Sequence, residues 1–147
     1  MTANLESLID CAIFAPSIRN TQPWKFSITG NEIQLFADVY RWLKVADPDR
    51  RELFVSLGCA LENLLVAAEH FGYASEVAHF PAAHEQELVA SVKFAPSGHP
   101  SGYRDPALFE AISARHTNRK VYESRPIPQA DLMPGRVQSQ KGLTEVS

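Results

Sequence analysis

The sequence predicts an α+β fold, because segments in which apolar residues recur at helical spacing are separated by segments in which apolar and polar residues alternate. Two predicted helices flank a β-hairpin, and two weaker strands and a short third helix follow. The chain has 147 residues, of which 45% are hydrophobic and 21% are charged. These values are typical of one globular domain with a core of its own.

The first helix and the hairpin account for the beginning of the chain. Residues 5–14 carry apolar side chains at helical spacing, and Pro16 ends that pattern. Alternating apolar residues over 24–28 and 33–37, with a turn at Gly30 between them, indicate two antiparallel strands. A polar loop therefore connects the end of the helix to the first strand.

The second helix is the longest that the sequence predicts. Asp47 followed by Pro48 is typical of an N-cap and a first helical position, and an apolar stripe then continues to Gly72. Four small residues lie in the middle of this helix: Ser56, Gly58, Cys59 and Ala60. They allow close approach of another helix, so we expect this helix to lie at a crowded interface.

The remaining elements are shorter. Weaker strands are predicted over 75–80 and 87–94, and a loop rich in Pro, Ser and Gly over 95–102 is the best internal boundary. Asp105 and Pro106 then begin a short helix that ends near Arg115. The residues after 131 have several breakers and no apolar period, which predicts disorder. We divide the chain into three parts: residues 1–103, residues 104–131 and a disordered tail, 132–147.

Charge and cysteine content exclude several classes of function. The net charge is −3 and no run of Lys and Arg forms a polybasic patch, so we expect no nucleic-acid partner. We expect neither a signal peptide nor a membrane helix. Cys11 and Cys59 stand among apolar neighbours, as small buried residues of a reducing compartment do, which predicts the cytoplasm. The spacing of the His and Cys residues predicts no metal site.

One motif lies in the loop after the first helix. Residues 14–24 read Phe-Ala-Pro-Ser-Ile-Arg-Asn-Thr-Gln-Pro-Trp. Pro16 and Pro23 frame a rigid polar segment directly before an aromatic-ended strand. A loop of this kind can present fixed hydrogen-bond donors to a ligand.

The second motif follows the third helix. Arg115-His116-Thr117-Asn118-Arg119 places two guanidinium groups four residues apart around a hydroxyl. Two arginines and a hydroxyl donor match a phosphate monoester in charge and geometry. Taken alone, the motif also fits a solvated helix C-terminus that is stabilised by arginine.

The two motifs together resemble the flavin-contacting loop and the phosphate motif of the FMN-dependent nitroreductase family. Their order, with the loop first, is similar to the tandem branch of that family, which includes mycobacterial Acg-type proteins and holds both halves of a domain-swapped dimer in one polypeptide. The resemblance covers roughly residues 4–131. It implies an α+β nitroreductase-like fold, present as an incomplete half of a fused pseudo-dimer, and we expect a truncation or frame change to explain the tail.

The resemblance also implies the cofactor, the site and the reaction. Pro16, Ser17 and Asn20 would contact the isoalloxazine and ribityl region of FMN. The phosphate would be held by Arg115, Thr117 and Arg119, with His116 in a secondary contact. NAD(P)H would reduce the flavin, which would then reduce a nitroaromatic or a quinone by two electrons. We assign no catalytic residue of the protein, since the cofactor carries the chemistry.

Two alternatives to this enzyme remain open. The chain could be a non-catalytic protein that binds or sequesters flavin, or an inactive truncated fragment. Turnover with a nicotinamide would separate an enzyme from the other two. We also expect a homo-oligomer, because the long helix would otherwise expose a face suited to packing.

Overall fold

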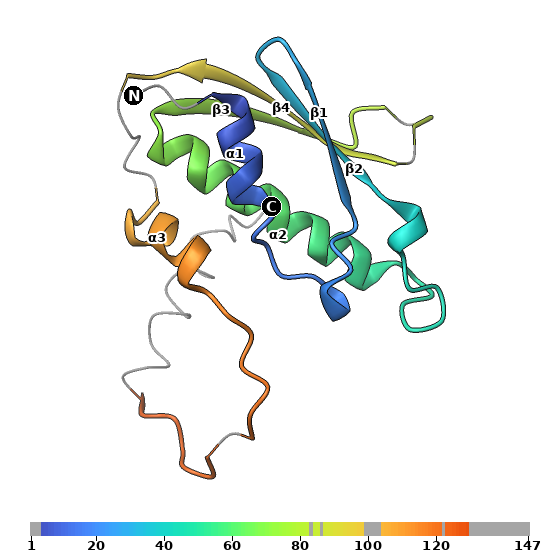
Figure 1. Cartoon of the computed structure of the whole chain (residues 1–147), viewed down its shortest axis with the longest axis vertical. Coiled ribbons are helices and arrows are strands. Elements are labelled where there is room, and N and C mark those ends of the chain that lie inside the picture. Colours follow the sequence, from blue (N-terminus) through green and yellow to red (C-terminus); the bar gives the residue numbers. More distant parts are fainter. Residues whose placement is uncertain (1–3, 83, 86, 99–103, 122, 130–147) are drawn as a thin grey trace, which may run out of the picture. The chain divides into compact units, whose positions relative to one another are not determined.

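The computed structural model describes residues 4–82, 84–85, 87–98, 104–121 and 123–129. The chain divides into two units, residues 1–117 and residues 118–147, and each is described by itself. The first unit contains, in chain order, α1 (Leu5–Ala12), η1 (Ile18–Asn20), β1 (Trp24–Thr29), β2 (Glu32–Ala37), η2 (Val39–Arg41), α2 (Arg51–His70), β3 (Tyr73–His79), β4 (Leu88–Pro96) and α3 (Ala107–Ala114) (Figure 1). The elements η1 and η2 are single 3₁₀ turns.

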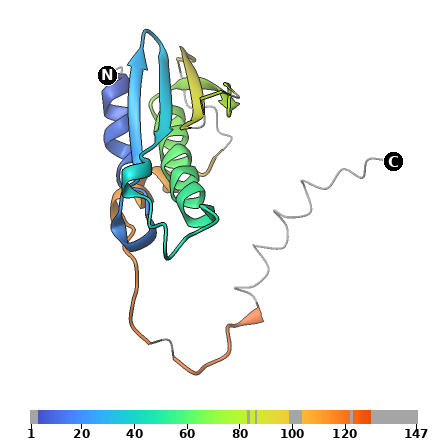
Figure 2. The same ribbon diagram turned by 90° about the vertical axis from the view of Figure 1, so that its right-hand side faces the viewer.

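The four strands form one antiparallel sheet in the order β1-β2-β4-β3. β1 and β2 form the predicted hairpin (Figure 2). On the central pair, Ile33 lies opposite Val92 and Leu35 opposite Ala90, with a bulge between Leu35 and Phe36. Because strand side chains alternate between faces, this register directs the apolar residues of β2 and β4 to the same side of the sheet.

The core lies between that face of the sheet and the helices α1 and α2. Leu8 of α1, Leu57 and Leu64 of α2, Ile33 of β2 and Val92 of β4 are fully buried. Burial of each such side chain stabilises the fold by about 1.5–3 kcal/mol. The predicted α+β fold class is confirmed.

The other face of the sheet is polar in its central strands. Ser91 on β4 donates a hydrogen bond to a carboxylate oxygen of Glu32 on β2 at 2.6 Å, and Gln34 donates to Glu32 at 3.1 Å. The bond from Ser91 is the main reason that the pKa of Glu32 is lowered from its ordinary value. The alternation of the hairpin thus separates an apolar inner face from a hydrogen-bonded outer one.

The start of α2 differs from the prediction. The helix begins at Arg51, so Pro48 is not its first residue, and Arg50 precedes it in the left-handed region at a φ of 61°. Asp47 lies one turn earlier, where its carboxylate accepts hydrogen bonds from the backbone N–H groups of Glu52 and Leu53, both at 2.9 Å. The predicted N-cap is therefore wrong in position. Asp47 still accepts hydrogen bonds from the first backbone N–H groups of the helix, which have no partner within it, because the turn after Asp47 brings its carboxylate back to them.

Two opposing influences set the charge state of Asp47. Burial raises its pKa, but the hydrogen bonds from Glu52 and Leu53 outweigh burial and lower the pKa below its ordinary value. Charge-assisted bonds to helix amides favour the ionised carboxylate in this way. The ionised carboxylate of Asp47 therefore has a structural role at the start of α2.

The length and composition of α2 alone would also allow it to cross a membrane. Its buried side chains instead pack into the core described above, as in the central helix of a globular domain. Of the small residues in its middle, Ser56 and Ala60 are buried, whereas Gly58 is exposed and has open space around it among the described residues.

In the second unit, the described residues make local contacts. Asn118 accepts a hydrogen bond from the backbone N–H of Lys120 at 3.0 Å, and Arg125 pairs with Glu123 at 3.1 Å on exposed side chains. The predicted disordered tail, residues 132–147, lies outside the described residues.

Candidate functional site

The first motif forms a compact loop, residues 13–23, between α1 and β1. η1 lies within it, and the backbone N–H groups of Asn20 and Thr21 donate to the carbonyls of Ser17 and Ile18, both at 3.0 Å. The hydroxyl oxygen of Ser17 accepts a hydrogen bond from Gln22 N–H at 2.9 Å. The 13–23 loop is therefore closed on itself around Ser17.

Three non-glycine residues of this loop have positive φ. The values are 47° at Arg19, 58° at Asn20 and 49° at Gln22. Left-handed backbone costs roughly 1 kcal/mol or more for such residues, although asparagine tolerates it better than most. Strain of this kind persists only where the surrounding structure holds the segment.

Contacts from α2 and η2 hold the loop. On one side, the buried Ser56 hydroxyl accepts from Ile18 N–H at 3.3 Å and donates to the Glu52 carbonyl at 2.8 Å. On the other, Arg41 donates to the carbonyls of Thr21 and Gln22 at 3.2 and 3.4 Å.

Arg41 is itself oriented by a carboxylate. The buried Asp38 pairs with Arg41 at 3.5 Å and with Lys25 at 3.2 Å, and its backbone N–H donates to the Pro23 carbonyl at 2.8 Å. Sequence reasoning counted Ser56 among the small residues of the long helix and gave none of Ser56, Arg41 and Asp38 a role in holding the loop. Their distance along the chain from the loop left no local signal.

The second motif begins where α3 ends. Arg115 follows the helix with extended backbone (ψ 132°), which turns the chain away from the helix axis. One terminal nitrogen of its guanidinium donates to the Thr117 hydroxyl at 3.3 Å, and the other donates to the carbonyl of Phe14 at 3.3 Å. The structure thus brings the start of the second motif to the start of the first, across 101 positions of sequence.

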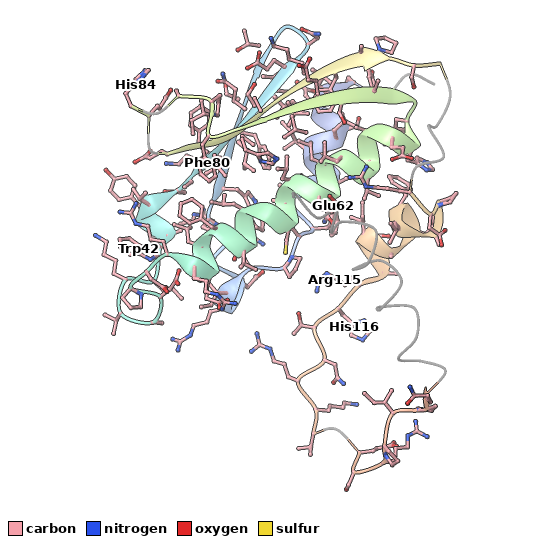
Figure 3. The ribbon with its side chains drawn as sticks, turned by 180° about the vertical axis from the view of Figure 1, so that it is seen from behind. Trp42, Glu62, Phe80, His84, Arg115 and His116 are labelled. Atoms are coloured by element: carbon pink, nitrogen blue, oxygen red, sulfur yellow. The ribbon has the colours of Figure 1, made fainter. Side chains whose placement is uncertain are left out.

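The other members of the 115–119 segment are exposed. His116 lies beyond Arg115 at the end of α3 (Figure 3), with its Nδ1 3.5 Å from the Ala114 carbonyl. Arg119 belongs to the second unit. Within the described residues, no hydrogen bond joins Arg115 to the side chain of Ser17 or of Asn20.

A hollow of about 200 Å³ lies beside Arg115, between α2 and α3. Glu62 lines it from α2 (Figure 3), but this carboxylate is paired with Arg104 through contacts of 2.9 and 3.2 Å. The lining also includes Asn63, Val66, Leu108, Ala111 and Ile112. The pairing of Glu62 with Arg104 reduces the negative charge that Arg115 meets there.

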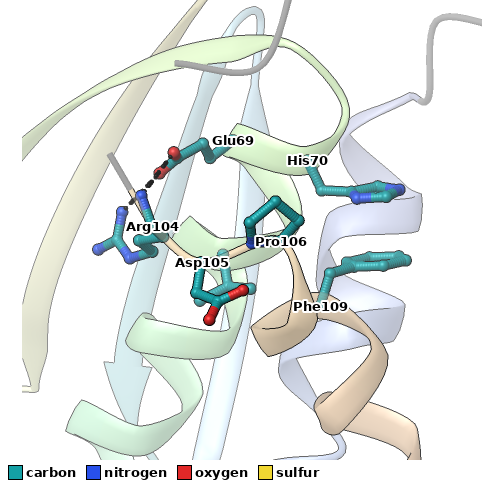
Figure 4. Close-up of a pocket in the computed structure, with 7 residues that line it drawn as sticks. Glu69, His70, Arg104, Asp105, Pro106 and Phe109 are labelled. Atoms are coloured by element: carbon teal, nitrogen blue, oxygen red, sulfur yellow. Dashed lines mark hydrogen bonds and ion pairs between the residues drawn. The ribbon is translucent and has the colours of Figure 1, made fainter. Parts of the chain in front are cut away.

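A second hollow of about 250 Å³ lies at the C-terminal end of α2 (Figure 4). His70 and Phe109 stack along it with ring centroids 3.6 Å apart, and Arg104 pairs with Glu69 at 3.1 Å. These charges are committed to each other, so this hollow is not a candidate for the phosphate. Among the described residues, no group of three or more His, Cys, Asp and Glu side chains could hold a metal ion.

Comparison with solved structures identifies the class of fold. The chain matches a structure described as a putative NADH oxidase from Clostridium acetobutylicum with a TM-score of 0.54 and 17% identity, covering 79% of this chain and 87% of that one. It matches a nitroreductase family protein from Clostridium difficile with a TM-score of 0.51 and 15% identity, covering 88% and 83%. A structure described as a putative NAD(P)H:FMN oxidoreductase from Staphylococcus epidermidis gives a TM-score of 0.51 at 11% identity, covering 78% and 84%. The fold is that of the nitroreductases.

Sequence comparison identifies the branch. The chain is 34% identical over 128 residues to a Mycobacterium tuberculosis protein named "Putative NAD(P)H nitroreductase Rv3131", and 31% identical over 123 residues to "Putative NAD(P)H nitroreductase acg" of the same organism. These alignments cover 87% and 83% of this chain. No family model matches the sequence. The matched segment belongs to the nitroreductase family, among the Acg-like proteins, and it spans 37% of the length of these relatives.

Proposed function

We propose that this chain contributes an FMN-binding site to an NAD(P)H-dependent oxidoreductase of the nitroreductase type. The observation that carries the proposal is the Arg115 guanidinium, which donates both to Thr117 in its own segment and to the Phe14 carbonyl in the 13–23 loop. The two motifs that family members use for one flavin are thereby joined in a single chain. The names of the relatives support the nicotinamide donor, and the fold neighbour from Staphylococcus epidermidis, an NAD(P)H:FMN oxidoreductase by name, supports the flavin.

The donor set at the second motif fits a phosphate monoester. Arg115 and Thr117 already face each other, and both are exposed to a ligand. A guanidinium and a hydroxyl supply charge and directed hydrogen bonds to phosphate oxygens. We propose that His116 and Arg119 add charge to the same group.

The first motif fits the ring and ribityl part of the flavin. The Ser17 oxygen accepts from Gln22 N–H, which leaves the hydroxyl hydrogen to donate to a ligand. Asn20 is exposed, and its left-handed backbone is held by the 3₁₀ turn beneath it. Pro16 fixes the direction in which the loop leaves α1.

The chemistry requires little of the protein. When bound, FMN accepts two electrons from a nicotinamide and passes them to an acceptor such as a nitroaromatic or a quinone. The proposed residues bind the cofactor, orient it and donate hydrogen bonds to it. The strained loop, held from both sides, provides the fixed orientation that such a role needs.

The assembly and its location form part of the same proposal. We propose that residues 1–103 correspond to the first half of a tandem protein and residues 104–131 to the opening of the second half. We also propose that the chain forms a homo-oligomer, as the sequence predicts. Cys11 and Cys59 are free thiols, and we propose the cytoplasm because free cysteines are typical of a reducing compartment. Burial raises the pKa of Cys11, with a further contribution from Asp10.

The test is a visible absorption spectrum of the purified chain with and without added FMN. The double variant Arg115→Ala/Arg119→Ala should lose FMN binding by at least tenfold in affinity, because each arginine supplies a charge-assisted contact to the phosphate. Arg51→Ala is the matched control, since Arg51 is an exposed arginine that pairs with Glu52 and belongs to neither motif. An FMN affinity that is unchanged in the double variant would contradict the proposal. Turnover with NADH or NADPH then separates an enzyme from a protein that only sequesters flavin.

A further inference from the structure

A hollow of about 480 Å³ opens beside the 13–23 loop. Its lining consists of Arg19, Trp42, Leu43, Lys44, Val45 and Ala46. A smaller hollow of about 260 Å³ shares Trp42 and Lys44 and is also lined by Val39, Arg50 and Glu87. The larger volume lies in the range of small-molecule sites. Arg19 comes from the same strained turn as Ser17 and Asn20.

Trp42, labelled in Figure 3, lines both hollows. Its indole N–H donates to the Asp47 carbonyl at 2.7 Å, which sets the orientation of the ring. The Arg50 guanidinium lies 4.6 Å from the ring centroid and the Lys44 ammonium lies 5.6 Å from it. Cation–π attraction therefore holds two positive charges beside one aromatic ring.

The described residues offer no carboxylate partner to these positive charges. In the part of the chain that the structure describes, no acidic group forms an ion pair with Arg19, Lys44 or Arg50. Asp47 is nearby, but its carboxylate is occupied by the backbone amides of α2. Glu87 lines only the smaller hollow, so the described lining of the larger one contains two cations and no acidic residue. Like charges gathered around one hollow favour an anion.

We propose that this hollow binds the 2′-phosphate of a reduced nicotinamide nucleotide, so that the protein prefers NADPH to NADH. The inference rests on the proposed function, which supplies the need for a nicotinamide donor. The two donors differ only in this phosphate, and nucleotide sites select it with arginine, whereas a carboxylate at the ribose selects NADH. Arg19 and Lys44 supply the cations, and Arg19 lies in the loop that we propose for the flavin ring.

The experiment compares adenosine 2′,5′-bisphosphate with adenosine 5′-monophosphate, because these probes differ only in the 2′-phosphate. Calorimetric titration of the full chain should give about tenfold tighter binding of the bisphosphate. Arg19→Gln/Lys44→Gln should reduce that preference to twofold or less. Arg51→Gln should keep it, since Arg51 is an exposed cation of the same region that pairs with Glu52 and does not line the hollow.

The outcomes separate this inference from the proposed function. Equal affinity for the two probes in the unmodified chain, or a preference that survives in Arg19→Gln/Lys44→Gln, would overturn the inference. The visible spectrum with FMN is recorded on every variant. A chain that binds FMN without a preference for the bisphosphate overturns only the NADPH site, whereas a chain that shows the preference without binding FMN retains the site and loses the flavin proposal. Circular dichroism establishes that the double variant is folded.

Discussion

The 13–23 loop and the 115–119 segment differ in how the fold supports them. The loop carries three left-handed residues and is held by Ser56 from α2 and by Arg41 from η2. The segment after α3 is exposed, and among the described residues the one hydrogen bond that joins it to the 13–23 loop comes from the side chain of Arg115. The 13–23 loop is thus held by several tertiary hydrogen bonds, whereas one side chain links Arg115 to it. Substitutions should therefore reduce stability in the first region and ligand affinity alone in the second.

The largest effect on stability should come from Ser56→Ala. The variant removes the acceptor of Ile18 N–H and leaves that amide without its partner in a partly buried position. We expect a loss of about 1–3 kcal/mol in the free energy of unfolding, together with faster proteolysis within the 13–23 loop. Urea denaturation and limited proteolysis measure the two effects.

Ser113→Ala is the matched control for this prediction. Ser113 is exposed and donates to the Glu110 carbonyl of its own helix at 3.4 Å, so its removal should change stability by less than about 0.5 kcal/mol. Equal losses in the two variants would mean that Ser56 does not hold the loop.

A smaller effect, which depends on pH, should come from Asp47→Asn. The folded pKa of Asp47 lies below its ordinary value of 3.8, so the ionised carboxylate stabilises the fold above that value, and this stability is lost as the pH falls through the folded pKa. The variant keeps one acceptor oxygen but no charge, and it should melt at a lower temperature than the parent at pH 7. Below about pH 4 the two melting temperatures should converge.

Thermal melts from pH 7 to pH 2 measure this convergence. Glu32, whose pKa is also lowered, should leave some acid dependence in both proteins. A difference in melting temperature that stays constant down to pH 2 would contradict the assignment of charge to Asp47.

The smallest effect on stability should come from Arg115→Ala. Its guanidinium is exposed, and its bonds to Phe14 and Thr117 are both 3.3 Å long, so the free energy of unfolding should change by less than about 0.5 kcal/mol. FMN affinity, measured on the same preparation, should fall. A loss of stability as large as that of Ser56→Ala would show that Arg115 contributes as much to the fold as Ser56 does, which would contradict the difference between the two regions.

The elements of the fold could be predicted because their signals are local. Helical spacing in residues 5–14 and alternation in 24–28 and 33–37 depend only on near neighbours, and α1, β1 and β2 occur at those positions. β3 begins two residues before the predicted 75–80 and β4 ends two residues after 87–94, as strand ends often do.

The features that the sequence left unpredicted involve distant residues or strained backbone. Nothing in Asp47-Pro48 indicates that Arg50 would take a left-handed conformation and shift the helix start to Arg51. The site residues Pro16, Ser17, Asn20, Arg115, His116, Thr117 and Arg119 were inferred from resemblance, and their roles stay predictions. The residues that hold the loop were missed, because a hydrogen bond between Ser56 and Ile18 depends on how α2 packs and not on any pattern in either segment.

The bond between Arg115 and the Phe14 carbonyl also has a consequence for the order of folding. It closes a loop of 101 residues, and closure of a long loop is opposed by chain entropy until the intervening structure has formed. We therefore expect the sheet and the packing of α1 on α2 to form before the two motifs meet. During synthesis the 13–23 loop can take its shape while residue 115 is still being added, so the site that we propose would be the last part of the first unit to assemble and the first to open.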